Sequence, residues 1–310
     1  MSVIWITGAR GFIGQHLSLH LSSLGHKVCG IGHGSFTDSQ LESSGLVYWI
    51  TSNITSTSLS ALAEQSGYPE FIYHLAGGSS VGASFYQPLD DYHRTVSSGV
   101  VLFEWIRTNT LGTKVILISS AAVHGSSHTT PISAYDFCDP YSPYGFHKYM
   151  LEQLARSYAN SFNLSFVIVR LFSVYGPFLR KQLIWDLCCK IQASSSGRIV
   201  LGGTGMEYRD WTHISDVIRL LENVASLASP SIPIFNAGTG LAHSVSDIAT
   251  LVVKAWHLDI DIDFTGHTRP GDPAYLVSTP CTINSVVFPF HCSLNHGLTD
   301  YVFWFKSTCL

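Results

Sequence analysis

Charged side chains are scarce in this 310-residue chain: Asp, Glu, Lys and Arg make up 12% of it, and the formal net charge is -4. The Lys and Arg residues form no run that could follow a phosphate backbone, which argues against nucleic acid as a partner. No stretch reaches the roughly 18 to 20 uninterrupted apolar residues of a membrane-spanning helix. The N-terminus also lacks the basic and long apolar regions of a secretory signal. We therefore expect a cytoplasmic protein without a membrane or nucleic-acid partner.

The cysteines and histidines lack the spacing of metal sites. The seven cysteines contain no Cys-x-x-Cys pair, and their odd number favours reduced packing cysteines over a disulfide framework. The fifteen histidines include no His-Glu-x-x-His pattern. The sequence therefore predicts no metal.

Hydrophobic residues, in contrast, make up 46% of the chain, enough to bury a large core. Over the first 170 or so residues, short β-branched or aromatic runs alternate with longer helix-compatible segments. Expected strands lie at 3–7, 27–31, 47–50, 71–75, 114–119 and 165–171. Between the first two, apolar residues recur at helical spacing over 12–24, and Gly25 follows as a C-cap. This alternation predicts an α/β fold with a doubly wound parallel sheet.

The regular alternation ends near Gly176, and Gly-rich and Pro-rich turns follow. We therefore predict a large domain over residues 1–172 and a smaller C-terminal domain over residues 173–310. Parts of the latter, about 207–240, are expected to return to the first domain.

A glycine-rich turn joins the first expected strand to the first expected helix, with Gly8, Gly11 and Gly14 in a Gly-x-x-Gly-x-x-Gly spacing. Without side chains the backbone can approach a pyrophosphate, whose negative charge faces the helix N-terminus. A purely structural turn is the alternative. The position at the first strand–helix junction favours a dinucleotide-binding site.

The end of the second expected strand carries no acidic residue. In NAD sites an acid there holds the ribose 2′-hydroxyl, whereas residues 30–34 read Gly-Ile-Gly-His-Gly and the next acid is Asp38. Arg10 in the glycine turn and His33 at the strand end are placed to face a 2′-phosphate, which suits the several donors of arginine. The alternative for Arg10 is a solvated loop residue. The cofactor is thus predicted to be NAD(P), with NADP(H) slightly favoured over NAD.

Ser120 directly follows the fifth expected strand, and Tyr144 and Lys148 begin a helix about 24 residues later. A carbonyl accepts hydride only as its oxygen gains a proton. Tyrosine titrates near 10 in free form, and a lysine ammonium nearby favours its phenolate. Four residues apart, Tyr144 and Lys148 share one helix face, and Ser120 supplies a second hydrogen bond to the same oxygen. An exposed helix pair would explain the Tyr-x-x-x-Lys spacing alone. Combined with the glycine turn, the pattern predicts three catalytic residues.

Together these motifs resemble the extended short-chain dehydrogenase/reductases, in particular the nucleotide-sugar branch called the NAD-dependent epimerase/dehydratase family. The segments that carry this resemblance are 74–78, 170–177, 209–217, 235–238 and 269–272. It implies a dinucleotide-binding Rossmann domain, followed by a domain that binds a nucleotide sugar. Relatives often form homodimers through two long helices. The apolar stretches 100–106 and 151–158 fit that role, and core packing explains them nearly as well.

The resemblance also assigns individual residues. Beside the glycine turn, Arg10 and His33, it implies cofactor contacts from Phe12, Ile13, Asn53, Ile54, Leu75, Ala76, Gly77 and Ser119, and from Tyr144 and Lys148 themselves. At the substrate it implies Ser120, Ser173, Arg209 and Arg269. Arg209 has a structural alternative, an ion pair with Asp210 or Asp216. Thr95, where relatives commonly carry Asn, departs from the family pattern. His74 and His147 are expected to be structural.

The reaction follows from what stands after Ser120. Dehydrating relatives carry Asp-Glu there, whereas Ala121 and Ala122 move no proton, so dehydration is not expected. The preferred interpretation is an epimerase that transiently oxidises C4 of a nucleotide-linked hexose with a bound NAD(P). A ketoreductase that consumes NADPH to reduce a 4-keto sugar is the alternative. A catalytically inactive nucleotide-binding protein is a third.

Overall fold

The structure is a computed structural model that describes residues 1–194, 197–268 and 272–309. The chain forms two compact units. The first contains Met1–Gly125, Phe137–Leu171 and Ile218–Phe235, and the second contains Ser126–Asp136, Phe172–Val217 and Asn236–Leu310. Chain order therefore does not follow the spatial units, because residues 218–235 rejoin the N-terminal part.

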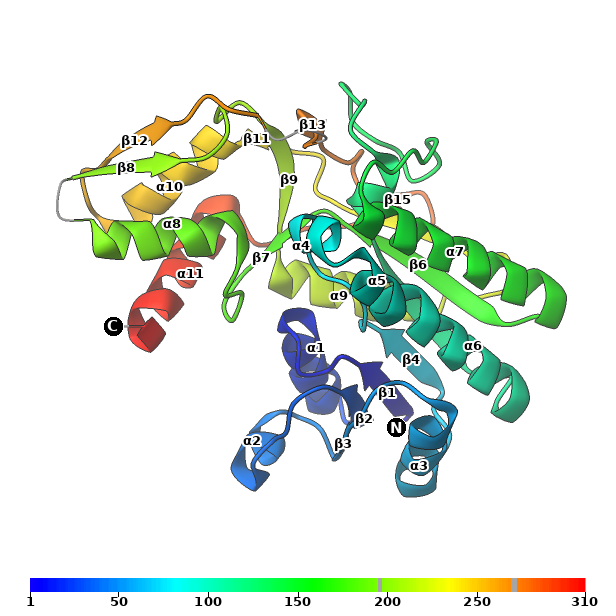
Figure 1. Ribbon diagram of the computed structural model, residues 1–310. Coiled ribbons are helices and arrows are strands. Elements are labelled where there is room, and N and C mark those ends of the chain that lie inside the picture. The colour runs from blue at the N-terminus through cyan, green and yellow to red at the C-terminus, as the bar shows by residue number, and fades with distance from the viewer. Residues whose placement is uncertain (195–196, 269–271, 310) are drawn as a thin grey trace. The chain divides into compact units, whose positions relative to one another are not determined.

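A seven-stranded sheet forms the centre of the first unit, in the order β10-β6-β5-β4-β1-β2-β3 (Figure 1). The strands are β1 (Val3–Thr7), β2 (Lys27–Gly32), β3 (Tyr48–Thr51), β4 (Phe71–His74), β5 (Lys114–Ser120), β6 (Ser165–Leu171) and β10 (Ile234–Ala237). The five pairings among β1 to β6 are parallel. The predicted α/β fold is therefore confirmed, and the bounds of the six expected strands are correct to within one residue.

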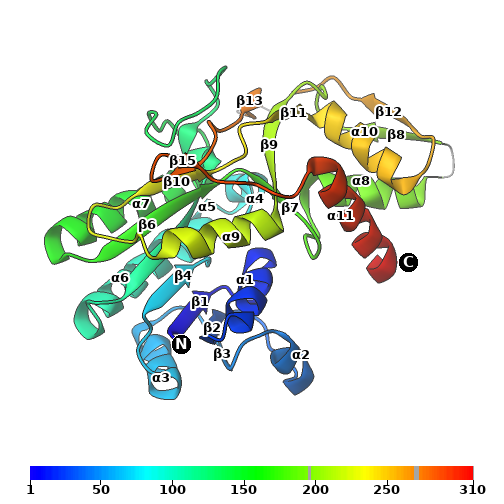
Figure 2. The ribbon, with the colours of Figure 1, turned by 180° about the vertical axis from the view of Figure 1, so that it is seen from behind.

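Helices cover both faces of this sheet, which explains why its strands read as continuous apolar runs. The helical segments are α1 (Phe12–Ser23), α2 (Asp38–Ser43), α3 (Ser56–Ser66), α4 (Val81–Tyr86), α5 (Pro88–Tyr92), a π-helical turn (His93–Ser97), α6 (Ser98–Asn109), a 3-10 turn (Ala121–His124), α7 (Pro143–Phe162) and α9 (Ile214–Ala225), which begins in the second unit. Helices α6 and α7 run side by side on one face. Helices α1 and α9 lie on the other face (Figure 2). There His20 of α1 contacts Glu222 of α9 at 2.7 Å.

The second unit is built around β9 (Tyr208–His213), which pairs with β7 (Ser173–Tyr175), β11 (Ala242–Ser244) and β13 (Tyr275–Leu276). Two further pairs are β8 (Arg198–Leu201) with β12 (Asp261–Phe264), and β14 (Thr282–Ile283) with β15 (Val286–Val287). Its helices are α8 (Gln182–Ala193), α10 (Val245–Trp256) and α11 (Leu294–Cys309). Phe305 of α11 packs against Trp185 of α8 and Trp256 of α10, with ring centroids 5.1 and 5.9 Å apart.

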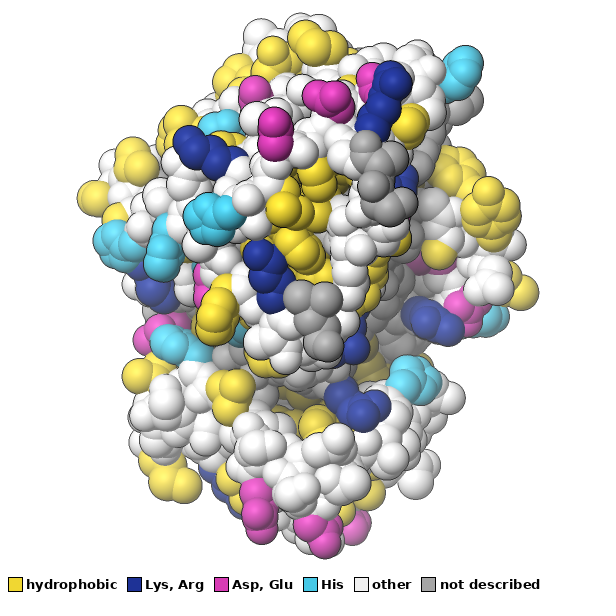
Figure 3. All heavy atoms as spheres, turned by 90° about the vertical axis from the view of Figure 1, so that its left-hand side faces the viewer, with side chains coloured by type: hydrophobic (Ala, Val, Ile, Leu, Met, Phe, Trp, Pro, Cys, Tyr) yellow, Lys and Arg dark blue, Asp and Glu magenta, His cyan; other side chains and the backbone are white. Residues whose placement is uncertain are grey.

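Charges are spread thinly over the surface. On the face shown in Figure 3, basic side chains stand apart from one another among uncharged, acidic and histidine side chains. Among residues 1–194, 197–268 and 272–309, no helix has both the length and the apolarity to span a membrane. In those same ranges no cluster of three or more His, Cys, Asp or Glu side chains is arranged to hold a metal ion.

The strand order reverses between β1 and β4, which are neighbours in the sheet. In open parallel sheets, ligands bind outside the carboxyl ends of the strands at such a reversal point. Here Gly8 follows β1 and Leu75 follows β4. The topology therefore places the glycine turn and the loop after β4 at one binding position.

Candidate functional site

The glycine turn leaves the end of β1 and opens α1. Gly8 has φ +73°, in the left-handed region that favours glycine, and its N–H donates to the Ile31 carbonyl at 2.8 Å. A Cβ on Gly14 would lie 2.5 Å from the Gly8 carbonyl oxygen, so only glycine permits this close approach. Gly11 is the N-cap of α1 and offers no side chain to the first N–H groups of the helix. The turn thus fits a pyrophosphate at the N-terminus of α1.

The loop after β4 lies against this turn. A Cβ on Gly8 would be 3.2 Å from the Ala76 nitrogen, and the Thr7 hydroxyl accepts a hydrogen bond from the Ala76 N–H at 3.2 Å. Further along, the Gly78 N–H donates to the hydroxyl of Thr95 at 2.8 Å. Thr95 is fully buried in the π-helical turn, a geometry that is frequent at functional sites.

Tyr144 and Lys148 lie in the first turns of α7, as their spacing predicts. Ser142 is the N-cap, and its hydroxyl accepts a hydrogen bond from the Gly145 N–H at 3.1 Å, while Pro143 starts the helix. The Lys148 Nζ donates to the Ile118 carbonyl of β5 at 3.0 Å and lies 6.0 Å from the centre of the Tyr144 ring. Ser120, at the end of β5, is near enough to the Tyr144 side chain to act on the pKa of its hydroxyl. The structure therefore brings all three expected catalytic residues together.

Burial shifts both titratable groups. It raises the pKa of the Tyr144 hydroxyl, although the hydrogen bond with Ser120 opposes this rise, and the Asp91 carboxylate adds to it. It lowers the pKa of Lys148 to about 8, against the opposing influence of Asp91 and Glu152. The pKa of Tyr144 is therefore raised overall, whereas the sequence predicts that the ammonium of Lys148 lowers it.

A buried ion pair supports β5 and α7 from behind. Glu152 is fully buried, and its carboxylate accepts from Arg170 Nε at 3.0 Å and Nη2 at 2.7 Å. It also accepts from the Ser119 hydroxyl at 2.5 Å. Ser119, an expected cofactor contact, is therefore engaged in the core beneath the site.

Of the expected 2′-phosphate residues, His33 follows β2, and Arg10 reaches the same segment from the glycine turn. Arg10 and His33 are both exposed. The Arg10 guanidinium lies 5.3 Å from the centre of the Phe36 ring, and a Cβ on Gly34 would clash with its terminal nitrogen. Because the indole N–H of Trp49 donates to the Gly34 carbonyl at 3.0 Å, the loop that carries His33 is anchored to β3.

The remaining expected residues fall in several places. Asn53 is exposed and Ile54 half-buried just after β3, and Leu75 is half-buried after β4. Ser173 begins β7, and Arg209 lies in β9 of the second unit. There the Arg209 Nη2 pairs with Asp272 at 2.8 Å. The Asp210 carboxylate instead accepts hydrogen bonds from the backbone N–H groups of Thr239 and Gly240. Arg269 lies outside the described residues.

Three polar residues that the sequence did not assign to the site surround Tyr144 and Lys148. The buried Ser84 hydroxyl of α4 accepts from the Tyr144 N–H at 3.1 Å, and Asp91 of α5 pairs with His147 of α7 at 2.6 Å. Ser84 lies 60 residues before Tyr144 in the chain, and Asp91 lies 56 residues before His147. The one signal in the sequence is that His147 stands inside the Tyr-x-x-x-Lys segment.

Comparisons with known proteins agree with this geometry. A family profile described as the NAD dependent epimerase/dehydratase family matches residues 4–238. A probable UDP-arabinose 4-epimerase from Arabidopsis thaliana is 26% identical, over 90% of this chain and 74% of that protein.

Two solved structures extend the similarity to the whole chain. MoeE5 in complex with UDP-glucuronic acid and NAD is 28% identical, with a TM-score of 0.85 over 98% of this chain and 99% of that one. UDP-glucuronic acid 4-epimerase from Bacillus cereus, in complex with UDP-glucuronic acid and NAD, is 27% identical, with a TM-score of 0.83 over 98% and 99%. These matches confirm the predicted resemblance, and the chain is an enzyme of the NAD dependent epimerase/dehydratase family.

Proposed function

We propose that the chain is a nucleotide-sugar 4-epimerase that oxidises C4 of its substrate transiently with a bound NAD(P). The observation that carries this proposal is the grouping of Ser120, Tyr144 and Lys148 beside the carboxyl ends of β4 and β5. The matched proteins are named as UDP-sugar 4-epimerases or were solved with UDP-sugars and NAD.

In this mechanism Tyr144 takes the proton of the C4 hydroxyl and later returns it to the same oxygen, with the configuration at C4 inverted. Ser120 holds that oxygen and stabilises its charge. Lys148 supplies positive charge next to the phenol. A dinucleotide held at the glycine turn of Gly8, Gly11 and Gly14 would supply the hydride acceptor for C4, and its oxidised ring would supply positive charge where burial alone leaves the pKa of Tyr144 raised.

Two observations separate this reaction from others. Ala121 and Ala122 are 2% and 7% exposed and carry no proton-transferring group, which disfavours elimination of water. The acid-free end of β2 supports the second candidate, an NADPH-dependent reductase of 4-keto sugars. The guanidinium of Arg10, which lies over the Phe36 ring, offers donors for a 2′-phosphate, and this supports the slight preference for NADP(H) over NAD.

For the substrate we propose a nucleotide diphosphate sugar, with Ser173, Arg209 and Arg269 as its contacts in the second unit. Arginine binds a diphosphate through paired hydrogen bonds, and Arg209 already orients its guanidinium on Asp272. We likewise assign the cofactor to the first unit. A reducing, cytoplasmic location is consistent with the seven free cysteines.

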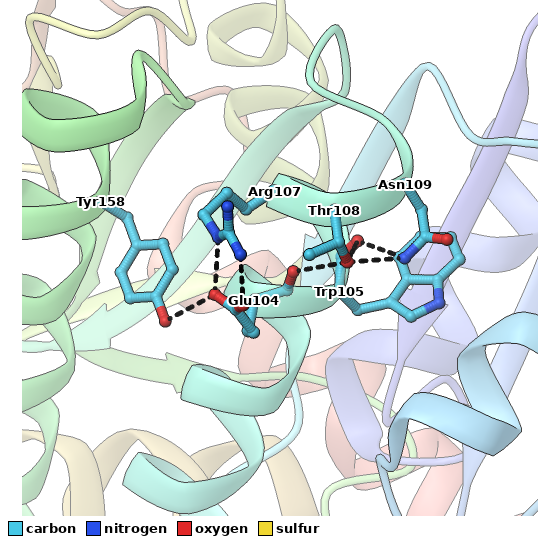
Figure 4. Close-up of polar contacts among 6 residues, drawn as sticks. All are labelled: Glu104, Trp105, Arg107, Thr108, Asn109 and Tyr158. Atoms are coloured by element: carbon cyan, nitrogen blue, oxygen red, sulfur yellow. Dashed lines mark hydrogen bonds and ion pairs between the residues drawn. The ribbon is translucent and has the colours of Figure 1, made fainter.

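We further propose a homodimer through the outer faces of α6 and α7. The apolar side chains Leu102, Phe103 and Ile106 are buried within the unit itself. Part of what the helices present outward is a polar group, in which Arg107 donates to Glu104 at 2.7 Å and Tyr158 donates to it at 3.3 Å (Figure 4). Helix α7 also exposes the apolar side chains of Phe146, Met150 and Phe162. Light scattering with Glu104→Lys tests this, since a monomer-dimer shift is expected only if that face is covered.

The function is tested with the purified protein and UDP-sugars that differ at C4. Interconversion of two epimers without added NAD(P)H, from a preparation that retains cofactor, is the expected result. Stoichiometric loss of NADPH with a 4-keto sugar would support the reductase instead. Cofactor binding without turnover of either substrate would support the inactive nucleotide-binding protein.

Tyr144→Phe is the matched variant, because it removes one hydroxyl and keeps the ring. Turnover should fall by about 10²- to 10⁴-fold, the usual contribution of a positioned acid–base group. Cofactor affinity should stay unchanged. Undiminished turnover would remove Tyr144 from the mechanism.

A further inference from the structure

Asp91 is a buried carboxylate that the proposed mechanism does not use. It is 6% exposed, and its Oδ2 lies 2.6 Å from His147 Nδ1. The Tyr92 ring packs edge-on against the His147 ring, with centroids 5.6 Å apart. The carboxylate and the imidazole are therefore held in one arrangement between α5 and α7.

The loop after β4 connects this carboxylate to the ammonium of Lys148. A Cβ on Gly78 would lie 1.7 Å from Asp91 Oδ1, and a Cβ on Gly77 would lie 3.1 Å from Lys148 Nζ. The Asp91 carboxylate and the Lys148 ammonium thus lie against successive residues of the same loop. Lys148 is 4% exposed, so water screens this attraction little.

Other charged or titratable groups face Lys148 from the elements around it. On α7, Glu152 acts on Lys148 but is committed to Arg170, and Tyr144 is neutral because burial raises its pKa. On β4, His74 stays neutral because burial lowers its pKa to about 3. On β5, the uncharged carbonyl of Ile118 accepts a hydrogen bond from Lys148 Nζ.

Of the two carboxylates that act on Lys148, Asp91 is therefore the one that no arginine is shown to neutralise among the described residues. Its partner, His147, is a side chain that carries charge only when protonated. Asp91 also has the larger influence of the two on Lys148.

We propose that Asp91, held in place by His147, is a positioning residue that keeps the buried side chain of Lys148 protonated at neutral pH. Its consequence for catalysis rests on the proposed function, since Lys148 acts there through Tyr144. The effect of Asp91 on the ionisation of Lys148 does not depend on the proposed function and can be measured without substrate.

The experiment follows the 15Nζ and 13Cε resonances of lysine-labelled protein against pH, with Lys148 assigned by its loss in Lys148→Met. In the wild type the Lys148 midpoint is expected near about 8, the pKa that results when burial lowers it and Asp91 and Glu152 oppose that fall. Asp91→Asn keeps the shape of the side chain and removes the charge. The midpoint should fall by roughly one unit, the effect of one unit charge at about 10 Å and an effective dielectric of about 20. An unchanged midpoint overturns the proposal.

His147→Gln is the matched control, because its amide still donates to Asp91 and leaves the carboxylate charged. Its Lys148 midpoint should stay at the wild-type value, since the carboxylate of Asp91 is kept. A fall as large as that in Asp91→Asn would show that the position acts through packing, and would overturn the charge account. Circular dichroism of both variants verifies that they are folded.

Turnover forms a separate arm. At pH 8 the protonated fraction of Lys148 should drop from about one half to about one tenth in Asp91→Asn, and the alkaline limb of the pH–kcat profile should move down by the same unit. A wild type that turns over no nucleotide sugar refutes the proposed function and leaves the resonance arm intact. If Asp91→Asn lowers the Lys148 midpoint but leaves the pH–kcat profile unchanged, the link from Asp91 to catalysis is refuted.

Discussion

Removing the carboxylate of Glu152 should strongly destabilise the first unit, because it leaves a buried guanidinium without its counter-charge. Glu152 and Arg170 form an ion pair with side chains 0% and 3% exposed. Two charge-assisted hydrogen bonds join them, at 3.0 and 2.7 Å, and a third comes from Ser119. In Glu152→Leu, Arg170 keeps its charge in the core without that carboxylate.

The expected loss follows from these contacts. Hydrogen bonds to charged groups contribute about 1.5–3 kcal/mol each, so the two from Arg170 amount to about 3–6 kcal/mol. Breaking a buried pair by removing one partner costs about 3–5 kcal/mol, in the same range. We therefore expect the free energy of unfolding to fall by about 3–5 kcal/mol, a large part of the roughly 5–15 kcal/mol that domains possess.

Urea unfolding, followed by tryptophan fluorescence and far-UV circular dichroism, measures this loss from the midpoint and slope. The matched control is the double variant Glu152→Leu with Arg170→Met, which removes both charges. Because replacing a buried pair by apolar residues is often nearly neutral, the double variant should recover most of the stability. A single variant that loses less than about 1 kcal/mol, or a double variant no more stable than the single one, would refute the reasoning.

Gly14→Ala should weaken NAD(P) binding at least about tenfold, because its Cβ would meet the Gly8 carbonyl oxygen at 2.5 Å. Gly112→Ala, whose Cβ meets nothing within 4 Å, should bind normally in the same titration. Arg10→Ala should reduce NADPH affinity about tenfold, the loss of one charge-assisted contact, with little effect on NADH; equal losses for both would contradict the 2′-phosphate assignment. Finally, burial lowers the pKa of His74 to about 3, so the unfolded chain binds this proton first and stability falls as pH drops below about 6.5. Between pH 6.5 and 5, wild type should lose about 2 kcal/mol more than His74→Asn in urea unfolding, and parallel losses would disprove it.

Local patterns were enough for the sheet and for the residues that we propose to be catalytic. Strand runs and turn glycines depend on neighbours in the chain, and for this reason the expected strands match the structure to within one residue. The spacing of Tyr144 and Lys148 requires only one helix, and Ser120 only the end of a strand. These features could be predicted because a few consecutive residues specify each of them.

The environment of those residues depends on contacts between distant parts of the chain. Asp91 reaches His147 across 56 residues, and Arg209 selects Asp272 across 63, in preference to the adjacent Asp210 that the sequence offered. Nothing in the periodicity of either segment encodes which helix will pack against which strand. The sequence alone thus determined which groups we propose for the chemistry, because covalent spacing places them. The tertiary structure decided how strongly each is charged, because burial and the nearest opposite charge depend on the packing of segments far apart in the chain.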